Sequence, residues 1–167
     1  MNKWLELFKS NDYLGIKKYL RDGGDIHETN EAGEGVLACA LRARCDMDTL
    51  LLLIENGANI DATDDEGVSV LDIAITYDNL EMVRYLVASG RDVNTTYRRS
   101  GFTPLMAAAC YGRVEIAEYL LQQGADVTMA DRKGFTAVDF ARKMNKRSIL
   151  ELLEFDPQAP QNKNYAR

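Results

Sequence analysis

The chain has 167 residues, with 20 Lys and Arg against 26 Asp and Glu, so its formal charge is −6 at neutral pH. This acidity argues against general nucleic-acid binding, because a sequence-independent grip on phosphates needs surplus basic side chains. No stretch approaches the roughly 18 consecutive apolar residues of a membrane span, so we expect neither a membrane protein nor a secreted one.

Residues 1–29 predict two short amphipathic helices. Their apolar residues recur at helical spacing in two groups, which are Trp4, Leu5 and Phe8, then Ile16, Tyr19 and Leu20. Gly23 follows the second group and is the residue type that ends a helix. The segment lacks the turn motif that recurs later in the chain, so we expect an N-terminal cap.

From residue 30 onwards one sequence pattern repeats. The segments GEGVLACAL, GVSVLDIAI, GFTPLMAAA and GFTAVDFAR align without gaps, and their leading glycines are spaced by 34, 34 and 33 residues. These glycines are Gly33, Gly67, Gly101 and Gly134. A second series, Gly23, Gly57, Gly90 and Gly124, has spacings of 34, 33 and 34. Two interleaved series with one period predict a repeat protein.

Each repeat predicts a turn followed by two helices. Asp64 and Gly67 suit the first and fourth positions of a tight turn. Thr103 and Pro104 suit a helix start, where Pro loses no needed N–H group. Ser69 with Asp72, and Thr136 with Asp139, have capping-box spacing. The predicted core positions of the first helix are Leu37, Leu71, Leu105 and Val138, with Ala40, Ala74, Ala108 and Ala141 three residues later.

The second helix of each repeat is predicted in TLLLLIENG, EMVRYLVASG and EIAEYLLQQG, each ending at a glycine. Two copies are one residue longer than the others. We place one extra residue near ARCDMD, between two helices, and the other in the turn VNTTYRRSG.

A turn, a short helix opened by T-P-L and a longer helix ending in G-A-D-V, at a period of 33, resembles the ankyrin repeat. The best-matching copy is residues 101–112, followed by 124–127. The resemblance implies an all-α ankyrin-repeat solenoid of helix-turn-helix units joined by β-turn or hairpin fingers. We expect one domain over residues 1–155, divided into an N-terminal cap 1–29, repeats 30–63, 64–97 and 98–130, and a C-terminal cap 131–155. We expect residues 156–167 to form a disordered tail.

The resemblance also implies a function. Related proteins hold partners with the turn tips and the exposed side of the first helices, which together make a concave face. Mapped onto this chain, the predicted partner-binding residues are Asp65, Glu66, Val68, Tyr77, Arg99, Phe102, Tyr111, Arg132, Lys133 and Phe135. Further tip positions are Glu31, Ala32, Glu34 and Ser100, and further first-helix ends are Arg42, Ala43, Thr76, Cys110, Lys143 and Met144.

Aromatic residues in this map have two interpretations. Tyr77 and Tyr111 occupy equivalent positions, and we expect them to be exposed as part of an apolar stripe through the middle and later repeats. Phe102 and Phe135 either belong to that stripe or pack sideways against the neighbouring turn. Both interpretations of the Phe pair stay open.

Charge is distributed unevenly along the chain. Residues 1–97 carry 9 basic and 18 acidic side chains, whereas residues 98–167 carry 11 basic and 8 acidic ones. The turn tips follow the same trend, from Glu31, Glu34, Asp65 and Glu66 to Arg98, Arg99, Arg132 and Lys133. We therefore expect the later repeats to present a basic end that orients an acidic partner surface.

Signals for catalysis are weak. His27, the only histidine, follows a helix-stopping glycine and has no metal-ligand spacing around it, and the three cysteines form no C-x-x-C motif. We expect no catalytic residue, metal or cofactor, and a cytoplasmic monomer with reduced thiols. The predicted function is non-catalytic protein binding, as an inhibitor or an adaptor. The alternatives are a self-assembling structural subunit and an enzyme with Cys110 on its concave face.

Overall fold

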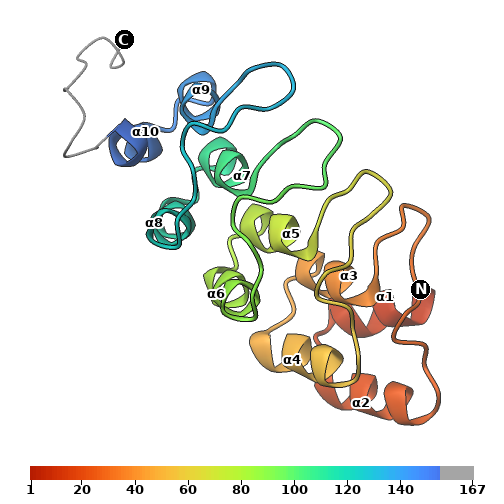
Figure 1. Cartoon of the computed structure of the whole chain (residues 1–167). Helices are drawn as coiled ribbons and strands as arrows, with labels where there is room; N and C mark the ends of the chain where they lie inside the picture. The colour runs from red at the N-terminus through yellow and green to blue at the C-terminus, as the bar shows by residue number, and fades with distance from the viewer. Residues whose placement is uncertain (155–167) are drawn as a thin grey trace. The chain divides into compact units, whose positions relative to one another are not determined.

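The computed structural model describes residues 1–154, and these residues form ten α-helices with no extended strand (Figure 1). The helices are α1 Asn2–Lys9, α2 Tyr13–Arg21, α3 Val36–Arg42, α4 Met47–Glu55, α5 Val70–Thr76, α6 Leu80–Ala88, α7 Pro104–Tyr111, α8 Val114–Gln122, α9 Ala137–Lys143 and α10 Arg147–Glu154. The first helices of the four repeats are α3, α5, α7 and α9. The expected tail at residues 156–167 lies outside the described residues.

The chain divides into two compact units. The first unit contains Met1–Arg91 together with Tyr97–Arg99, and the second contains Asp92–Thr96 and the chain from Ser100 onwards. In the first unit α3 packs against both α1 and α5, and each of these helices also packs on the second helix of its own pair. In the second unit α7 packs against α9, while α8 and α10 pack on them and on each other. The single domain expected over residues 1–155 stays a prediction.

A loop that we call a finger leads into each first helix. The fingers are residues 29–35, 63–69, 96–103 and 130–136, and Figure 1 shows them as the long loops before α3, α5, α7 and α9. Three of them close with an isolated antiparallel bridge, between residues 29 and 35, 63 and 69, and 130 and 136. The third finger is one residue longer, and there the Thr96 hydroxyl donates to the Phe102 carbonyl oxygen at 2.7 Å.

The predicted capping residues begin the first helices. Ser69 with Asp72, and Thr136 with Asp139, form complete capping boxes on α5 and α9. Thr103 caps α7, and Pro104 is its first residue. Because these side chains satisfy backbone N–H groups that have no partner within the helix, they fix where each helix starts.

The loops between paired helices also follow one rule. Each contains a residue with positive φ, namely Asn11, Arg44, Asp78, Gly112 and Asn145. The loop from Arg42 to Met47 has one residue more than the loop from Thr76 to Leu80, which places the predicted extra residue between α3 and α4. The predicted glycine stops are confirmed as well, since Gly57 and Gly90 have φ values of 98° and 101°.

The core of each unit lies between its two layers of helices. The predicted alanines of all four first helices are fully buried, and so are Leu37, Leu71 and Leu105. Val138 is only half-buried, which differs from the prediction because no later first helix covers α9 within the described residues. In the N-terminal cap, Trp4 and Phe8 are buried and stack at 5.7 Å between ring centroids, whereas Leu5 is 38% exposed.

Candidate partner-binding surface

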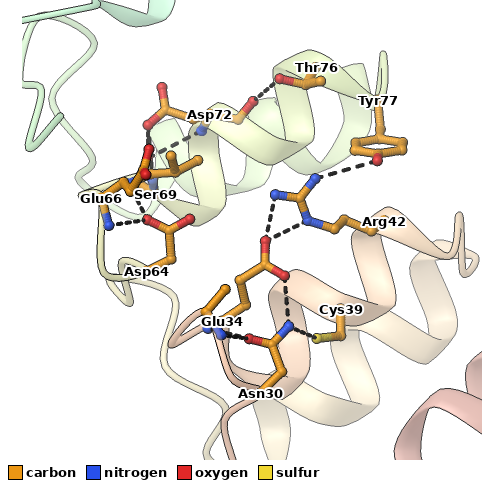
Figure 2. A network of polar contacts seen from close by, with 12 residues as sticks. Asn30, Glu34, Cys39, Arg42, Asp64, Glu66, Ser69, Asp72, Thr76 and Tyr77 are labelled. Carbon is orange, nitrogen blue, oxygen red and sulfur yellow. Dashed lines mark hydrogen bonds and ion pairs between the residues drawn. The ribbon is translucent and has the colours of Figure 1, made fainter. Parts of the chain in front are cut away.

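The finger tips have a backbone fixed by one repeated hydrogen-bond pattern. The Oδ1 atom of Asp64 accepts hydrogen bonds from the backbone N–H groups of Glu66 and Val68, both at 2.9 Å (Figure 2). Asn30 does the same in the first finger, and Asp131 in the fourth. The third residue after each of these is a glycine with positive φ. A polar side chain and a glycine therefore make each turn rigid.

The tips are also joined in pairs within each unit. In the first unit the Asp65 N–H donates to the Ala32 carbonyl oxygen at 3.1 Å, and in the second the Arg132 N–H donates to the Ser100 carbonyl oxygen at 2.9 Å. Backbone polar groups at the tips are therefore hydrogen-bonded within their own turn or to the adjacent finger. The side chains next to these groups, including Asp65, Glu66, Arg132 and Lys133, are exposed to solvent.

Glu34 is not the exposed tip residue that the sequence predicts. It is 8% exposed, and its carboxylate accepts from Nε of Arg42 at 2.5 Å and from Nδ2 of Asn30 at 2.8 Å (Figure 2). The Arg42 Nη2 atom also contacts the same carboxylate oxygen at 2.5 Å. The pair joins the first finger to the end of α3, so Glu34 has a structural role there.

Tyr77 is likewise engaged by neighbouring side chains. The guanidinium groups of Arg42 and Arg44 lie 5.8 and 5.4 Å from the centre of its ring. Arg42 donates to the Tyr77 hydroxyl and Arg44 to its carbonyl oxygen, each at 3.4 Å. Burial alone lowers the pKa of Arg42, but hydrogen bonds to Tyr77 and Glu34 outweigh this and raise it above its usual value. Tyr77 is half-buried in this cluster, so the exposure expected for it is only partial.

The second unit contains an aromatic cluster that the sequence interpretation missed in part. Phe102 and Phe135 both pack edge-on against Phe140, with ring centroids 5.1 and 6.1 Å apart. Phe102 is half-buried, whereas Phe135 remains 47% exposed. The equivalent residues of the earlier repeats are Cys39, Ile73 and Ala107, none of which is aromatic. The repeat pattern therefore gave no sign of an aromatic contact at Phe140, and its large ring was the one available signal.

The ends of the first helices in the second unit are open to solvent. Tyr111 is the last residue of α7, and Met144, at the equivalent position, directly follows α9; each is 47% exposed. The Arg113 guanidinium lies 6.0 Å from the centre of the Tyr111 ring. Cys110 beside it is half-buried.

The ten predicted residues fall into two groups. Asp65, Glu66, Val68, Tyr77 and Arg99 belong to the first unit, and Phe102, Tyr111, Arg132, Lys133 and Phe135 belong to the second. Val68 and Phe102 are half-buried, and Asp65, Glu66, Arg99, Tyr111, Arg132, Lys133 and Phe135 are exposed. The stripe expected to run through the middle and later repeats stays a prediction.

The described residues contain few of the features of a reactive centre. Within residues 1–154 no three His, Cys, Asp or Glu side chains are arranged to hold a metal ion. His27 lines a hollow of about 430 Å³ in the first unit, together with Asp61 and the apolar Leu37 and Val70. Burial raises the pKa of the Cys39 thiol, and it raises that of Cys45 to about 11, so both thiols are protonated at neutral pH.

Paired helices, bridged fingers and positive-φ glycines at a period of 33 to 34 residues define a repeat protein built for binding. Models of the ankyrin repeat match residues 7–97, as three copies, and residues 100–132. The chain belongs to the ankyrin repeat family, whose members are protein-protein interaction modules. No helix within residues 1–154 is long and apolar enough to cross a membrane.

Curated relatives cover parts of the chain. It is 32% identical to the potassium channel AKT2/3 of Arabidopsis thaliana over 71 residues, which is 42% of the chain and 9% of the channel. It is 30% identical to the nuclear factor NF-kappa-B p105 subunit of Gallus gallus over 56% of the chain and 10% of the relative. It is 37% identical to Protein PhlB of Serratia liquefaciens over 60% of the chain and 44% of the relative. The chain thus spans less than half the length of each of these three proteins.

Proposed function

We propose that the chain is a non-catalytic module that holds a partner protein, as an inhibitor or an adaptor. Each unit contributes the surface formed by its own finger tips and the exposed ends of its own first helices. One observation carries the proposal: the finger backbone is fixed by its own hydrogen bonds, while the side chains beside it are exposed. A surface held rigid before binding loses little conformational entropy on association.

The comparisons support this proposal in a general way. A plant potassium channel, a nuclear factor subunit and a bacterial protein, which differ from one another in kind, are each similar to part of this chain. Such a distribution fits a module that supplies binding to many systems. A monomeric state and a cytoplasmic location belong to the same proposal. The location is supported by the three cysteines at positions 39, 45 and 110, which are free thiols.

Affinity capture with matched variants tests the surface. One variant carries Glu66→Ala, Tyr111→Ala and Lys133→Ala, which are exposed finger and first-helix positions. The control carries Lys17→Ala, Leu14→Ala and Glu118→Ala, which are exposed positions on α2 and α8. We expect the first variant to lose proteins that the wild-type chain and the control retain, with an unchanged thermal midpoint. Loss of capture in the control alone would contradict the proposal.

Two further measurements test its other parts. Sedimentation at several concentrations should give a monomer throughout, whereas association that rises with concentration would favour the self-assembling alternative. Fractionation of the native cells should place the chain in the cytoplasmic fraction.

A further inference from the structure

Three basic side chains of the second unit lie at its fourth finger tip and at the end of α9. Arg132 and Lys133 are exposed at the fourth finger tip, and Lys143 is exposed at the end of α9. None of the three forms an ion pair with another residue of the described chain, whereas Arg142 pairs with Asp139 and Glu154.

Two acidic residues of the same side, Asp131 and Asp139, accept hydrogen bonds from their own turn or helix cap. Asp131 accepts two backbone hydrogen bonds in its own turn, and Asp139 accepts from the backbone and hydroxyl of Thr136. The remaining carboxylates of the unit's helices lie on its second helices, at Glu115 and Glu118 of α8 and at Glu151 and Glu154 of α10. Charge is therefore segregated within the unit, with the net positive side on the finger tip and α9.

Apolar surface lies beside these cations. Phe135, Tyr111 and Met144 are each 47% exposed. Because α7 packs against α9, the equivalent positions 111 and 144 lie at corresponding ends of two packed helices. Lys133 is two residues from Phe135, and Lys143 directly precedes Met144. Single exposed apolar residues need no explanation, but three beside cations that pair with no residue of 1–154 form a surface with its own chemistry.

We propose that this surface of Tyr111, Arg132, Lys133, Phe135, Lys143 and Met144 binds an acidic peptide segment that carries an apolar side chain. The inference rests on the proposed function and names the chemistry of the partner. The carboxylates of the segment pair with the three cations, and its apolar side chain packs between Phe135, Tyr111 and Met144. Nucleic acid fits less well, because three cations on a chain of net charge −6 release few counterions from a phosphate backbone.

Selection from a displayed random-peptide library, with the full chain as bait, tests the proposal. We expect peptides enriched in Asp and Glu around a Leu, Phe or Trp. A synthetic copy of a selected peptide is then titrated against the chain, and its affinity should fall as salt rises from 0.05 to 0.5 M, because screening weakens exposed charge pairs. Peptides in which the acidic residues become Gln, or the apolar residue becomes Ala, should bind about tenfold more weakly or worse.

Two pairs of variants locate the binding site. Lys133→Glu with Lys143→Glu should lower the affinity for the selected peptide about tenfold or more, because the new carboxylates repel the acidic residues of the peptide. Its control, Lys17→Glu with Lys18→Glu on α2, changes the net charge equally and should leave affinity unchanged. Tyr111→Ala with Met144→Ala should also weaken binding about tenfold. Leu14→Ala on α2, a residue 76% exposed, is the control for apolar truncation.

Three outcomes overturn the inference. They are selection of neutral or basic peptides, absence of any enriched peptide, and binding of a single-stranded oligonucleotide that displaces the acidic peptide. The proposed function is judged separately by the capture experiment. Neutral or basic peptides whose binding is lost in the Glu66, Tyr111 and Lys133 variant would refute the acidic partner and leave the interaction module standing.

Discussion

The Arg98 guanidinium lies 3.5 Å from the Asp72 carboxylate, measured from Nε to Oδ2. The Asp72 side chain is 4% exposed, and the same Oδ2 atom accepts hydrogen bonds from the backbone N–H and the hydroxyl of Ser69, both at 2.9 Å. One carboxylate thus closes the cap of α5 and pairs with Arg98 of the third finger, a residue that belongs to the first unit. Arg98, expected at a basic tip, has a structural contact there.

Replacing Arg98 separates these two roles of Asp72. Arg98→Met keeps the aliphatic packing but removes the cation from a buried carboxylate, so we expect a loss of about 1–2 kcal/mol in the free energy of unfolding. Asp72→Ala also removes the capping box and should cost about 1 kcal/mol more. Arg99→Met, on the exposed neighbour, should change stability by less than about 0.5 kcal/mol. Urea unfolding measures all three. Equal stability of Arg98→Met and wild type would contradict the role of the pair.

The helices, caps and turns could be predicted from the sequence because their signals are local. Thr103 and Pro104 begin α7, Asp64 and Gly67 form a turn, and Gly57 follows a helix end, each within a few residues of the feature that it determines. Because the repeats share one period, a cap, turn or helix end predicted in one copy is also predicted at the equivalent residues of the others.

Contacts of individual side chains could not be predicted in the same way. Arg42 and Tyr77 are 35 residues apart, and nothing in either repeat alone shows that they meet. Glu34 is buried because Arg42 replaces the Thr or Cys found at the same position in the next two repeats. A repeat pattern predicts which positions face the fingers, but the residue types at two positions together decide which side chains remain exposed.

Tyr77 should contribute to stability as well as to any binding surface. Tyr77→Ala removes a ring that two guanidinium groups contact, and we expect a loss of about 1–2 kcal/mol. Tyr77→Phe keeps the ring and removes only the hydroxyl acceptor, so it should cost about 0.5 kcal/mol or less. Tyr111→Ala, at the equivalent and more exposed position, serves as the comparison. Chemical denaturation would contradict the expectation if Tyr77→Ala and Tyr111→Ala had the same small effect.

Gly67 and Gly23 should differ in their tolerance of alanine, although both have positive φ, at 81° and 97°. A Cβ atom at Gly67 would collide with the Tyr97 carbonyl oxygen, whereas one at Gly23 meets nothing within 4 Å. Gly23→Ala should therefore cost only the backbone strain, about 1–2 kcal/mol. Gly67→Ala should cost at least about 1 kcal/mol more, because the finger backbone must also shift. Thermal unfolding of the two variants measures the difference in their stability. Equal midpoints would show that the backbone of the third finger moves away from the new Cβ atom at no measurable cost.

The Cys45 thiol should make the fold less stable at alkaline pH. Burial, and to a lesser extent the charge of Asp46, raises its pKa from 9.0 to about 11. Below pH 9 the thiol is protonated in both the folded and the unfolded chain, so it adds no pH dependence. Between pH 9 and about 11 the unfolded chain releases this proton while the folded chain retains it, so stability falls as pH rises.

Comparison of the wild-type chain with Cys45→Ala isolates this effect from the lysines and tyrosines that titrate in the same range. At pH 7 the variant is expected to be the less stable protein, because Cys45 is 3% exposed and its sulfur fills the space beside Phe8. From pH 9 to 11 the free energy of unfolding of the wild-type chain should fall by on the order of 1–2 kcal/mol more than that of the variant. The gap in stability between the two proteins therefore narrows. Urea unfolding under reducing conditions at both pH values measures the gap. A gap that stays constant, or widens, would mean that the thiolate of Cys45 is accommodated in the folded protein.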